Sequence, residues 1–310
     1  MKKYVFGVDV GGTTIKMGFF TVDGELLEKW EIPTRRENNS ENVLPDIAAA
    51  IDAKLAEKGI AKEEVSGVGF GVPGPVTKEG IIQMNANLGW RNKHVAKELG
   101  ELTGLPCMGG NDVKTAGLGE MWKGGAAEYD NAVFITLGTG VAAAIIVEGK
   151  VILGAMGAAG EVGHIKVNME ETASCGCGGV GCAEQYASAT GIVKMAKKKL
   201  EECDTPSVLR DAEVTSKAVF DAYKTGDELA TEVVEKFGHY LGYSLAATAA
   251  VVDPEAFIVG GGVSKAGDAL IEVIQKYYKQ YVWPGCRDKK FVLAKLGNDA
   301  GIYGAASYVL

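Results

Sequence analysis

The opening of this sequence follows a pattern that occurs again near its middle. Apolar runs at 4–8, 15–21 and 26–32 predict three strands, joined by a Gly/Thr-rich turn within 9–16 and by Asp23-Gly24. Apolar runs at 133–136, 141–147 and 150–153 return in the same order, joined by Leu137-Gly-Thr-Gly140 and by Glu148-Gly149. This repeat predicts two domains of like topology, although two short hairpins could also coincide by chance.

The rest of the chain alternates segments with helical and with strand-like patterns, which indicates an α/β protein. Helices are predicted from about 40 to 59, at 95–102, 113–122, 187–202, 216–225, 227–252 and 265–281, and from 298 onwards. Further strands are predicted at 65–72, 105–108, 256–259 and 291–294.

Composition and charge exclude several classes of partner. The chain has 310 residues, a net charge of −8 and a pI near 5.1, which argues against a nucleic-acid-binding or anionic-membrane surface. The longest apolar tract, 245–252, is far below a membrane span, and the first residues do not resemble a secretion signal. We therefore expect a cytoplasmic protein with no nucleic-acid or membrane partner.

Candidate metal ligands gather in the stretch 157–186. Cys175, Cys177 and Cys182 have the spacing C-x-C-x4-C with glycines between them, and His164 precedes the first cysteine by eleven residues. Three thiolates and one imidazole suit tetrahedral structural zinc. A disulfide and three inert buried thiols are the alternatives. A reducing cytosol disfavours the first, and the glycine-rich segment is a poor core segment.

Two carboxylates flank this set of ligands. Glu161 lies three residues before the histidine, and Glu184 lies two residues after the last cysteine. Folding of the segment around a metal would bring both acids to one side of it. We expect such a rigid, acidic wall to bind a polyhydroxyl compound.

The two Gly/Thr turns are candidate phosphate-binding sites. Small residues at Gly11, Gly12 and Thr13, and again at Gly138, Thr139 and Gly140, leave backbone amides able to cradle phosphate oxygens. Asp9, at a strand end, is placed to orient water on a magnesium ion. The alternative is that both are merely tight hairpins. The glycines at 260–262 could lie flat against a nucleotide, or allow close packing of a helix on the sheet.

Asn111-Asp112 lies between a predicted strand and a predicted helix. An aspartate here could be only the N-cap of the helix. It could also be a general base that accepts the proton of a substrate hydroxyl as that oxygen attacks phosphorus.

Taken together, these motifs resemble the ROK family of sugar kinases and repressors, and within it the bacterial ATP-dependent glucokinases. They are DVGGTTIK at 9–16, GVPGPV at 71–76, NLGW at 87–90, ND at 111–112, LGTG at 137–140, GAAGEVGH at 157–164, CGCGGVGCAE at 175–184 and GGGVS at 260–264. The resemblance covers essentially the whole chain. It implies an α/β, two-domain, actin-like (ribonuclease-H-like) ATPase fold with a zinc-binding insertion in the second domain.

The implied domains are a smaller N-terminal α/β domain at 1–112, joined by the C-terminal helix 299–310, and a larger C-terminal α/β domain at 113–298 that carries the zinc motif. We expect the crossing near residues 110–120 to act as a hinge. The resemblance also implies a homodimer, which nothing in the sequence itself demonstrates.

The resemblance assigns roles residue by residue. It makes the chain a glucokinase that uses ATP and Mg²⁺ to phosphorylate the 6-hydroxyl of D-glucose, with Asp112 as the base. Sugar-binding residues would be Asn111, Asp112, Glu161, His164, Glu184 and Gly71. Nucleotide-binding residues would be Asp9, Gly11, Gly12, Thr13, Lys16, Gly138, Thr139, Gly140, Gly261 and Gly262. Structural zinc would be held by His164, Cys175, Cys177 and Cys182.

The sequence departs from the family pattern in two places, of which the first should leave the phosphate turn intact and the second, through Lys114, bears on specificity. Alanines at 142–144 replace the usual glycines, and Val113-Lys114-Thr115 replaces small neutral residues after the base. A kinase for another hexose (N-acetylmannosamine, mannose or fructose) is a closer alternative. An axial and an equatorial hydroxyl differ in the position of one oxygen atom, and the sequence does not distinguish which of the two a site binds. A sugar-responsive repressor is a remote alternative, since only eight residues precede Asp9 and the charge disfavours DNA. Polyphosphate is a less favoured donor, given the segment GGGVS.

Overall fold

The computed structural model describes residues 2–85 and 87–310, which divide into two compact units. Unit 1 comprises Met1–Glu128, Lys150–Ala159 and Lys295–Leu310, and unit 2 comprises Tyr129–Gly149 and Gly160–Ala294. This division differs from the boundary expected after residue 112, because it keeps residues 113–128 with the first unit.

Unit 1 is built on a five-stranded sheet of order β3-β2-β1-β4-β7. The strands are β1 (Tyr4–Val10), β2 (Thr14–Thr21), β3 (Leu26–Pro33), β4 (Val65–Val72) and β7 (Cys107–Asn111). The first three form the predicted antiparallel meander, and β1, β4 and β7 run parallel. A small hairpin of β5 (Ile81–Asn85) and β6 (Trp90–His94) was not anticipated.

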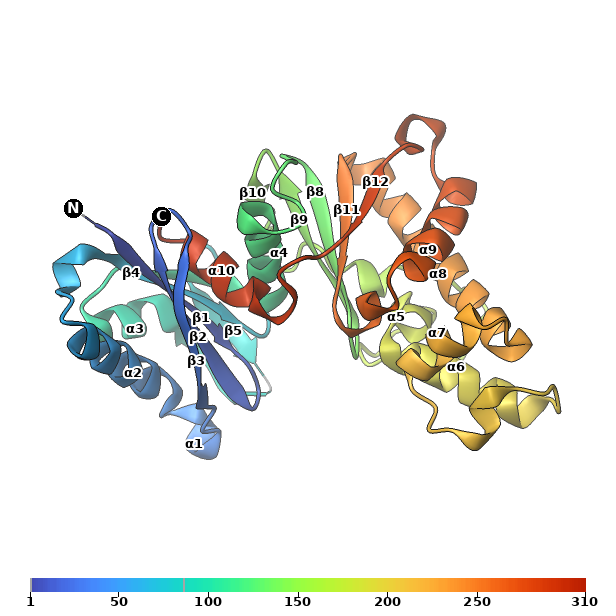
Figure 1. The fold of residues 1–310 in the computed structure, drawn as a ribbon, viewed down its shortest axis with the longest axis horizontal. Coiled ribbons are helices and arrows are strands. Elements are labelled where there is room, and N and C mark those ends of the chain that lie inside the picture. The colour runs from blue at the N-terminus through green and yellow to red at the C-terminus, as the bar shows by residue number, and fades with distance from the viewer. Residues whose placement is uncertain (1, 86) are drawn as a thin grey trace. The chain divides into compact units, whose positions relative to one another are not determined.

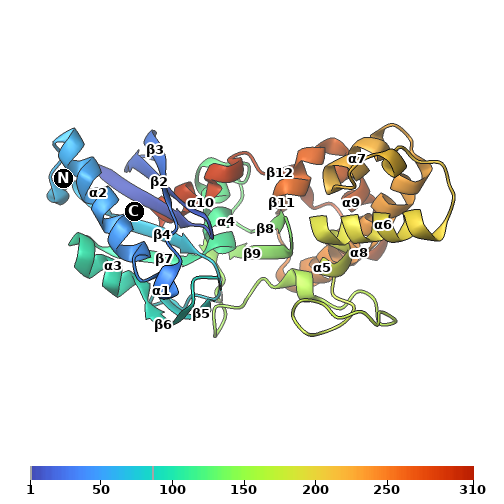
Figure 2. The same ribbon diagram turned by 90° about the horizontal axis from the view of Figure 1, so that it is seen from below.

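Helices cover both faces of this sheet (Figures 1 and 2). The short α1 (Glu37–Ser40) leads to α2 (Val43–Lys58), which packs with α3 (Val95–Thr103), while α4 (Asp112–Lys123) packs with α10 (Ala300–Ser307). Every third or fourth residue of α2 is buried, as its apolar spacing predicts. The core on that side joins α2 and α3 to β1, β2 and β4.

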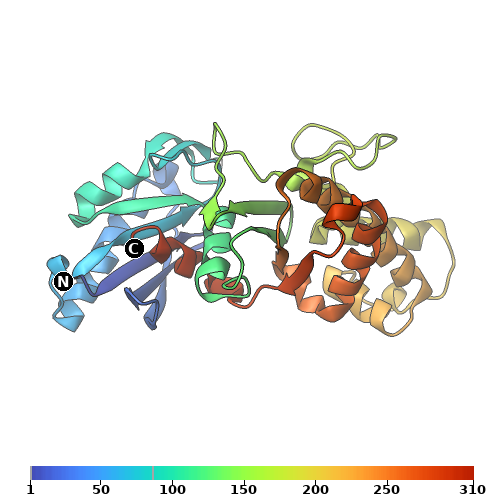
Figure 3. The same cartoon turned by 90° about the horizontal axis from the view of Figure 1, so that it is seen from above.

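Helix α4 belongs with unit 1 because it packs closely on α10. Figure 3 shows the green ribbon of α4 next to the red ribbon of α10. A Cβ at Gly304 would lie 1.6 Å from the carbonyl oxygen of Thr115, and one at Gly119 would lie 2.2 Å from that of Ala300. Only glycine permits this approach. The contact between two helices distant in sequence explains why residues 113–128 do not follow the predicted boundary.

Glu120, near the end of α4, is fully buried and binds three backbone N–H groups. Its Oε2 accepts from Gly125 (2.7 Å) and Lys295 (3.0 Å), and its Oε1 accepts from Leu296 (2.8 Å). The carboxylate therefore fixes the end of α4 to the segment that returns to α10. These bonds make a firm anchor at the end of the segment 110–120, in which we expected a hinge.

Replacing this anchor should cost stability. Glu120→Gln presents an amide NH₂ where a buried backbone donor needs an acceptor, so we expect the free energy of unfolding to fall by roughly 2–4 kcal/mol. Urea unfolding measures the loss, with the exposed Glu128→Gln as the control at the same chemical change. A loss no larger than that of the control would mean that Glu120 is not an anchor.

Unit 2 repeats the topology of unit 1. Its strands β8 (Ala132–Leu137), β9 (Val141–Val147), β11 (Ala256–Gly260) and β12 (Lys290–Leu293) lie in the order β9-β8-β11-β12. Strand β8 is antiparallel to β9 and parallel to β11, as β1 is to β2 and β4. The predicted repeat is therefore confirmed. The strand predicted at 150–153 is shorter, since β10 covers only Lys150–Val151 and the chain turns at Gly154.

The helices of unit 2 share one large apolar core with β8, β9 and β11. They are α5 (Glu184–Ala187), α6 (Ala189–Glu202), α7 (Ser216–Lys224), α8 (Glu228–Val252) and α9 (Asp268–Tyr281). The helix predicted at 265–281 starts later, because Gly267 has φ +71° and separates α9 from a 3₁₀ turn at Gly262–Ala266. Within residues 2–85 and 87–310, no helix is long and apolar enough to cross a membrane.

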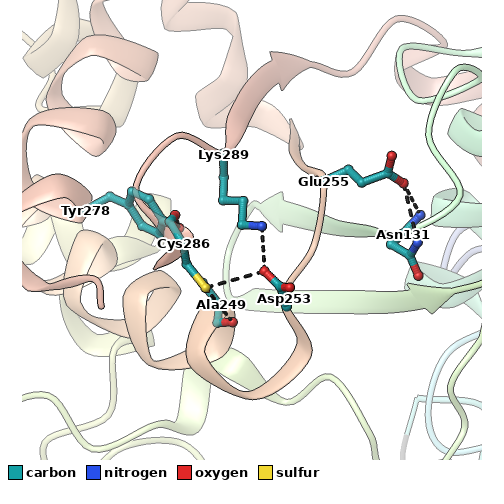
Figure 4. A network of polar contacts seen from close by, with 7 residues as sticks. All are labelled: Asn131, Ala249, Asp253, Glu255, Tyr278, Cys286 and Lys289. Atoms are coloured by element: carbon teal, nitrogen blue, oxygen red, sulfur yellow. Dashed lines mark hydrogen bonds and ion pairs between the residues drawn. The ribbon is translucent and has the colours of Figure 1, made fainter. Parts of the chain in front are cut away.

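Figure 4 shows the polar network that fixes the connection from α8 to β11. Asp253 ends α8 with φ 44°, and its Oδ1 accepts hydrogen bonds from Lys289 Nζ and from the Cys286 thiol. The Tyr278 hydroxyl donates to the Cys286 carbonyl at 2.6 Å. Cys286 is thus a structural residue, as its isolation in the sequence indicates.

Candidate functional site

Four residues that the sequence singles out meet at one edge of the sheet in unit 1. Asp9 pairs with Gly71 in the register of β1 and β4, and the next pair along β4 and β7 is Val72 with Asn111. Asp112 follows directly. Because β1, β4 and β7 are parallel, these are all carboxyl ends of strands, where α/β sheets bind their ligands.

Asn111, and not Asp112, is the N-cap of α4. The Asn111 Oδ1 accepts from the backbone N–H groups of Val113 (3.1 Å) and Lys114 (3.2 Å), and its Nδ2 donates to the Gly74 carbonyl (3.1 Å). The interpretation of Asp112 as the helix cap is therefore wrong. A cap one residue earlier leaves Asp112 available for another role.

The Asp112 carboxylate is oriented through one of its oxygens. Its Oδ1 accepts from Asn111 Nδ2 at 2.8 Å and from the Val113 N–H at 2.9 Å. Burial raises the pKa of Asp112, and these two hydrogen bonds together with the Lys114 charge oppose the rise. A carboxylate with a raised pKa is a better proton acceptor than one in water.

Asp9 shares this environment. Burial raises its pKa to about 6, the Lys16 charge lowers it and the Asp112 charge raises it, so the two carboxylates influence one another. The Asp9 carboxylate also lies against the start of α10, where a Cβ on Gly301 would be 2.7 Å from its Oδ2. Gly301 was missed in the sequence because a glycine near the start of a short helix gives no signal of a long-range contact.

The raised pKa of Asp9 has a consequence for stability. A carboxyl group whose pKa is higher in the folded chain stabilises the fold fully below its unfolded value, near 4, and this contribution is lost as the pH rises through about 6. Without magnesium or nucleotide, Asp9→Asn should therefore exceed wild type in unfolding free energy by about 2–3 kcal/mol above pH 6. The difference should vanish toward pH 4. Urea unfolding across this range measures it, with Asp23→Asn in an exposed turn as the control. A difference that does not change with pH would contradict the prediction.

The turn between β1 and β2 is closed by hydrogen bonds that leave one side open. The Gly11 N–H donates to the Thr14 carbonyl at 3.0 Å, and the Thr34 hydroxyl donates to the Gly11 carbonyl at 2.8 Å. A Cβ at Gly12 would meet nothing within 4 Å, and Thr13 is exposed. Lys16 points elsewhere, because its Nζ donates to the Asn298 carbonyl at 3.1 Å. Its role at a nucleotide stays a prediction.

The corresponding turn in unit 2 contacts Glu184. The Glu184 Oε2 accepts from the Val141 N–H at 2.9 Å, and a Cβ at Gly140 would lie 2.4 Å from the same oxygen. The Thr190 hydroxyl donates to the Thr139 carbonyl at 3.0 Å. Gly140 therefore has to be a glycine for the carboxylate to reach the turn.

A pocket of about 170 Å³ lies beside this turn within unit 2. Its lining includes Thr139, Cys175, Glu184, Ser188, Thr190 and Lys194. Ser188 caps α6 by accepting from the Gly191 N–H at 2.9 Å, so Thr190 and Lys194 lie in the first turns of that helix. The sequence analysis missed both residues, although a serine such as Ser188 at the start of a predicted helix is an N-cap signal that could have drawn attention to them.

The two predicted nucleotide glycines after β11 differ. Gly261 has φ +85°, and a Cβ there would lie 2.6 Å from the backbone of Leu137, so it allows β11 to end close against β8. Gly262 is exposed, with nothing within 4 Å of an added Cβ. Both lie at the carboxyl end of β11, beside the end of β8 that carries Gly138.

The four predicted metal ligands form one cluster. One ligand atom from each of His164, Cys175, Cys177 and Cys182 lies within 4.8 Å of the others. The Cys177 and Cys182 sulfurs are 3.7 Å apart, and His164 Nδ1 is 3.9 Å from the Cys175 sulfur. A tetrahedron with zinc–sulfur bonds of 2.3 Å has sulfur–sulfur edges of about 3.8 Å, so the donor set fits zinc.

Neighbouring groups hold this cluster in place. The Lys166 ammonium donates to the Cys182 sulfur at 3.1 Å, and Cys175 lies 3.8 Å from Glu184 Oε1. In the metal-free chain, burial raises the pKa of Cys175 to about 11, so a metal would have to displace its proton. Within unit 2, Glu184 therefore contacts both the metal-ligand cluster, at Cys175, and the turn 138–140, at the Val141 N–H.

The segment of Glu161 and His164 is a 3₁₀ turn packed on the sheet of unit 2. A Cβ at Gly163 would lie 2.1 Å from the Val141 carbonyl oxygen, and the Ser244 hydroxyl donates to the Val162 carbonyl at 3.0 Å. Glu161 itself is exposed. Its role toward a sugar stays a prediction.

Comparison with known proteins gives full-length matches. The sequence model of the ROK family matches residues 5–310. The glucokinase of Halalkalibacterium halodurans is 42% identical over 308 residues, which cover 97% of this chain and 93% of that protein. The glucokinase of Streptomyces coelicolor is 34% identical, covering 97% and 95% of the two chains. The crystal structure of a ROK family glucokinase from Streptomyces griseus in complex with glucose and AMPPNP has a TM-score of 0.76 at 32% identity, covering 98% of each chain.

Proposed function

Because this chain belongs to the ROK family, we propose that it is an ATP-dependent glucokinase that phosphorylates the 6-hydroxyl of D-glucose. The observation that carries the proposal is the position of Asp112. Asp112 is a partly buried carboxylate that directly follows the parallel strand β7. Asn111, and not Asp112, caps the helix α4 that follows.

Asp112 is the proposed general base. Its Oδ1 is occupied by Asn111 and Val113, so Oδ2 would accept the proton of the sugar 6-hydroxyl. The 6-oxygen would then attack the γ-phosphorus, the bond from that phosphorus to the β,γ-bridging oxygen would break, and ADP would leave. The raised pKa of Asp112 favours the proton transfer, and the Lys114 charge partly opposes that rise.

The two Gly/Thr turns are the proposed phosphate contacts, through the backbone amides at 11–13 and 138–140. Gly261 and Gly262 would lie near the adenosine. Magnesium, when bound, would neutralise phosphate oxygens, and Asp9 would hold its water ligands. Thr190 and Lys194 join this proposal because they line the pocket beside Thr139.

The proposed sugar-binding residues are Gly71, Asn111, Asp112, Glu161, His164 and Glu184. The proposed structural zinc would be held by His164, Cys175, Cys177 and Cys182, with the Lys166 ammonium partly offsetting the charge of the thiolates. Four protein ligands leave no open position for water, so the metal would be structural and not catalytic.

A panel of sugars assayed with ATP and magnesium tests the function. We expect the highest kcat/KM for D-glucose and a product phosphorylated at the 6-position. Preference for N-acetylmannosamine, mannose or fructose would favour a kinase for another hexose, and polyphosphate in place of ATP tests the donor. No turnover of any hexose, together with sugar-dependent DNA binding, would favour a repressor. Light scattering on the same sample tests the proposed homodimer.

A further inference from the structure

Lys114 is a buried lysine two residues after the proposed base. It lies in the first turn of α4 and is 2% exposed. Its ammonium group donates to the carbonyl oxygen of Gly157 at 2.7 Å, a contact within unit 1 between residues 43 positions apart. A buried ammonium group is costly unless it is well bonded, so a lysine here indicates a specific requirement.

Gly157 is a buried point in an otherwise exposed loop. Met156 is 56% exposed and Ala158 is exposed, whereas Gly157 is buried. It has φ +75°, and a Cβ there would lie 2.7 Å from the Val76 carbonyl oxygen. The loop is therefore attached to unit 1 at Gly157, by close packing on Val76 and by the hydrogen bond from Lys114.

The loop leads directly to proposed sugar-binding residues. It is closed by the Ala159 N–H, which donates to the Leu153 carbonyl at 3.1 Å. The next residue, Gly160, accepts from the Ala143 N–H at 3.0 Å and starts the segment of Glu161 and His164. Only two residues separate Gly157 from Gly160, so the chain has little slack between these attachments.

We propose that Lys114 is a positioning residue for the sugar site, which holds the Gly157 carbonyl and thereby fixes the loop from which the chain enters Glu161 and His164. This inference rests on the proposed function for its link to sugar. Its structural part does not, since the attachment of the loop can be measured without any substrate. The Lys114 charge also acts on Asp112, so one side chain would serve both the base and the loop.

Two substitutions separate the hydrogen bond from the charge. Lys114→Met keeps an unbranched side chain of similar length but removes the donor and the charge. Lys114→Gln is neutral yet can still donate to a carbonyl. Lys123→Met, at the exposed end of the same helix, is the matched control.

Hydrogen exchange on the substrate-free protein tests the attachment. We expect amides at 153–164 to exchange at least about tenfold faster in Lys114→Met than in wild type. The rest of unit 1 and the Lys123→Met control should be unchanged. Unchanged exchange at 153–164 would overturn the proposal, whatever the enzyme does.

Kinetics on the same proteins test the link to the sugar. We expect Lys114→Met to raise the KM for glucose roughly tenfold and to leave the KM for ATP within about twofold. Lys114→Gln should recover most of the glucose KM. A normal glucose KM despite faster exchange, or equal losses for glucose and ATP, would overturn the positioning role. A wild-type protein that phosphorylates no hexose would refute the proposed function. The hydrogen-exchange result would then still test whether Lys114 attaches the loop at Gly157.

If Lys114→Met does not fold, Lys114→Gln carries both measurements. Wild-type-like exchange and glucose KM in Lys114→Gln, together with loss of folding in Lys114→Met, would support the hydrogen bond as the essential interaction. Fast exchange at 153–164 in Lys114→Gln with a normal glucose KM would overturn the proposal.

Discussion

Asp112→Asn is expected to lower kcat for glucose phosphorylation by roughly 10²–10⁴, the usual contribution of a positioned general base. Asparagine keeps the shape of aspartate and can still accept the hydrogen bonds from Asn111 and Val113. It cannot take up a proton at neutral pH. The loss should therefore fall on the chemical step, with glucose affinity almost unchanged.

The measurement is steady-state kinetics combined with direct titration of glucose. Asp268→Asn is the matched control, because Asp268 is the first residue of α9 as Asp112 is of α4. A kcat near that of wild type for Asp112→Asn would remove Asp112 as the base. A large loss of glucose affinity with normal kcat would make it a binding residue instead.

Cys177→Ser is expected to abolish the binding of about one zinc ion per chain. A serine hydroxyl is a far poorer zinc ligand than a thiolate, so the variant keeps only three of the four good ligands. We expect the Tm to fall by roughly 5 °C or more, because binding of a structural metal contributes directly to folding.

The loss should weaken glucose binding more than ATP binding, roughly tenfold or more. The Glu184 carboxylate lies 3.8 Å from the Cys175 sulfur, and His164 has its second ring nitrogen available for a sugar hydroxyl once Nδ1 binds the metal. We therefore expect loss of the metal to leave His164 and Glu184 less firmly oriented toward the sugar. Because Glu184 also binds the Val141 N–H in the turn 138–140, a smaller effect on nucleotide affinity is expected as well.

Metal analysis by plasma mass spectrometry, thermal unfolding, and separate titrations of glucose and nucleotide check these expectations. Cys203→Ser is the control, since Cys203 lies outside the cluster and its thiol donates to the Lys199 carbonyl. A variant that loses zinc yet binds glucose normally would make the cluster a remote clip. It would also remove His164 and Glu184 from the sugar site.

The features that the sequence predicted well have local causes. Asp23-Gly24 and Glu148-Gly149 join adjacent apolar runs, so both hairpins could be read directly from the residues. The spacing of the three cysteines and His164 predicted a cluster that the structure confirms as a possible metal site. The family, and with it the two-domain α/β actin-like fold, followed from motifs spread along the whole chain and is also confirmed.

The sequence by itself determined the repeated sheet, the family and the metal-ligand set, because turns, apolar periodicity and ligand spacing act between residues close in the chain. Only the tertiary structure decided that Asn111 caps α4, that Glu120 anchors the return to α10, and that Lys114 is buried against Gly157. Each of these depends on the packing or backbone geometry of the folded chain, and the last two depend on a partner far along the sequence. The sequence does not distinguish a buried lysine from an exposed one, because only the fold brings the carbonyl oxygen that binds the buried ammonium group close to it.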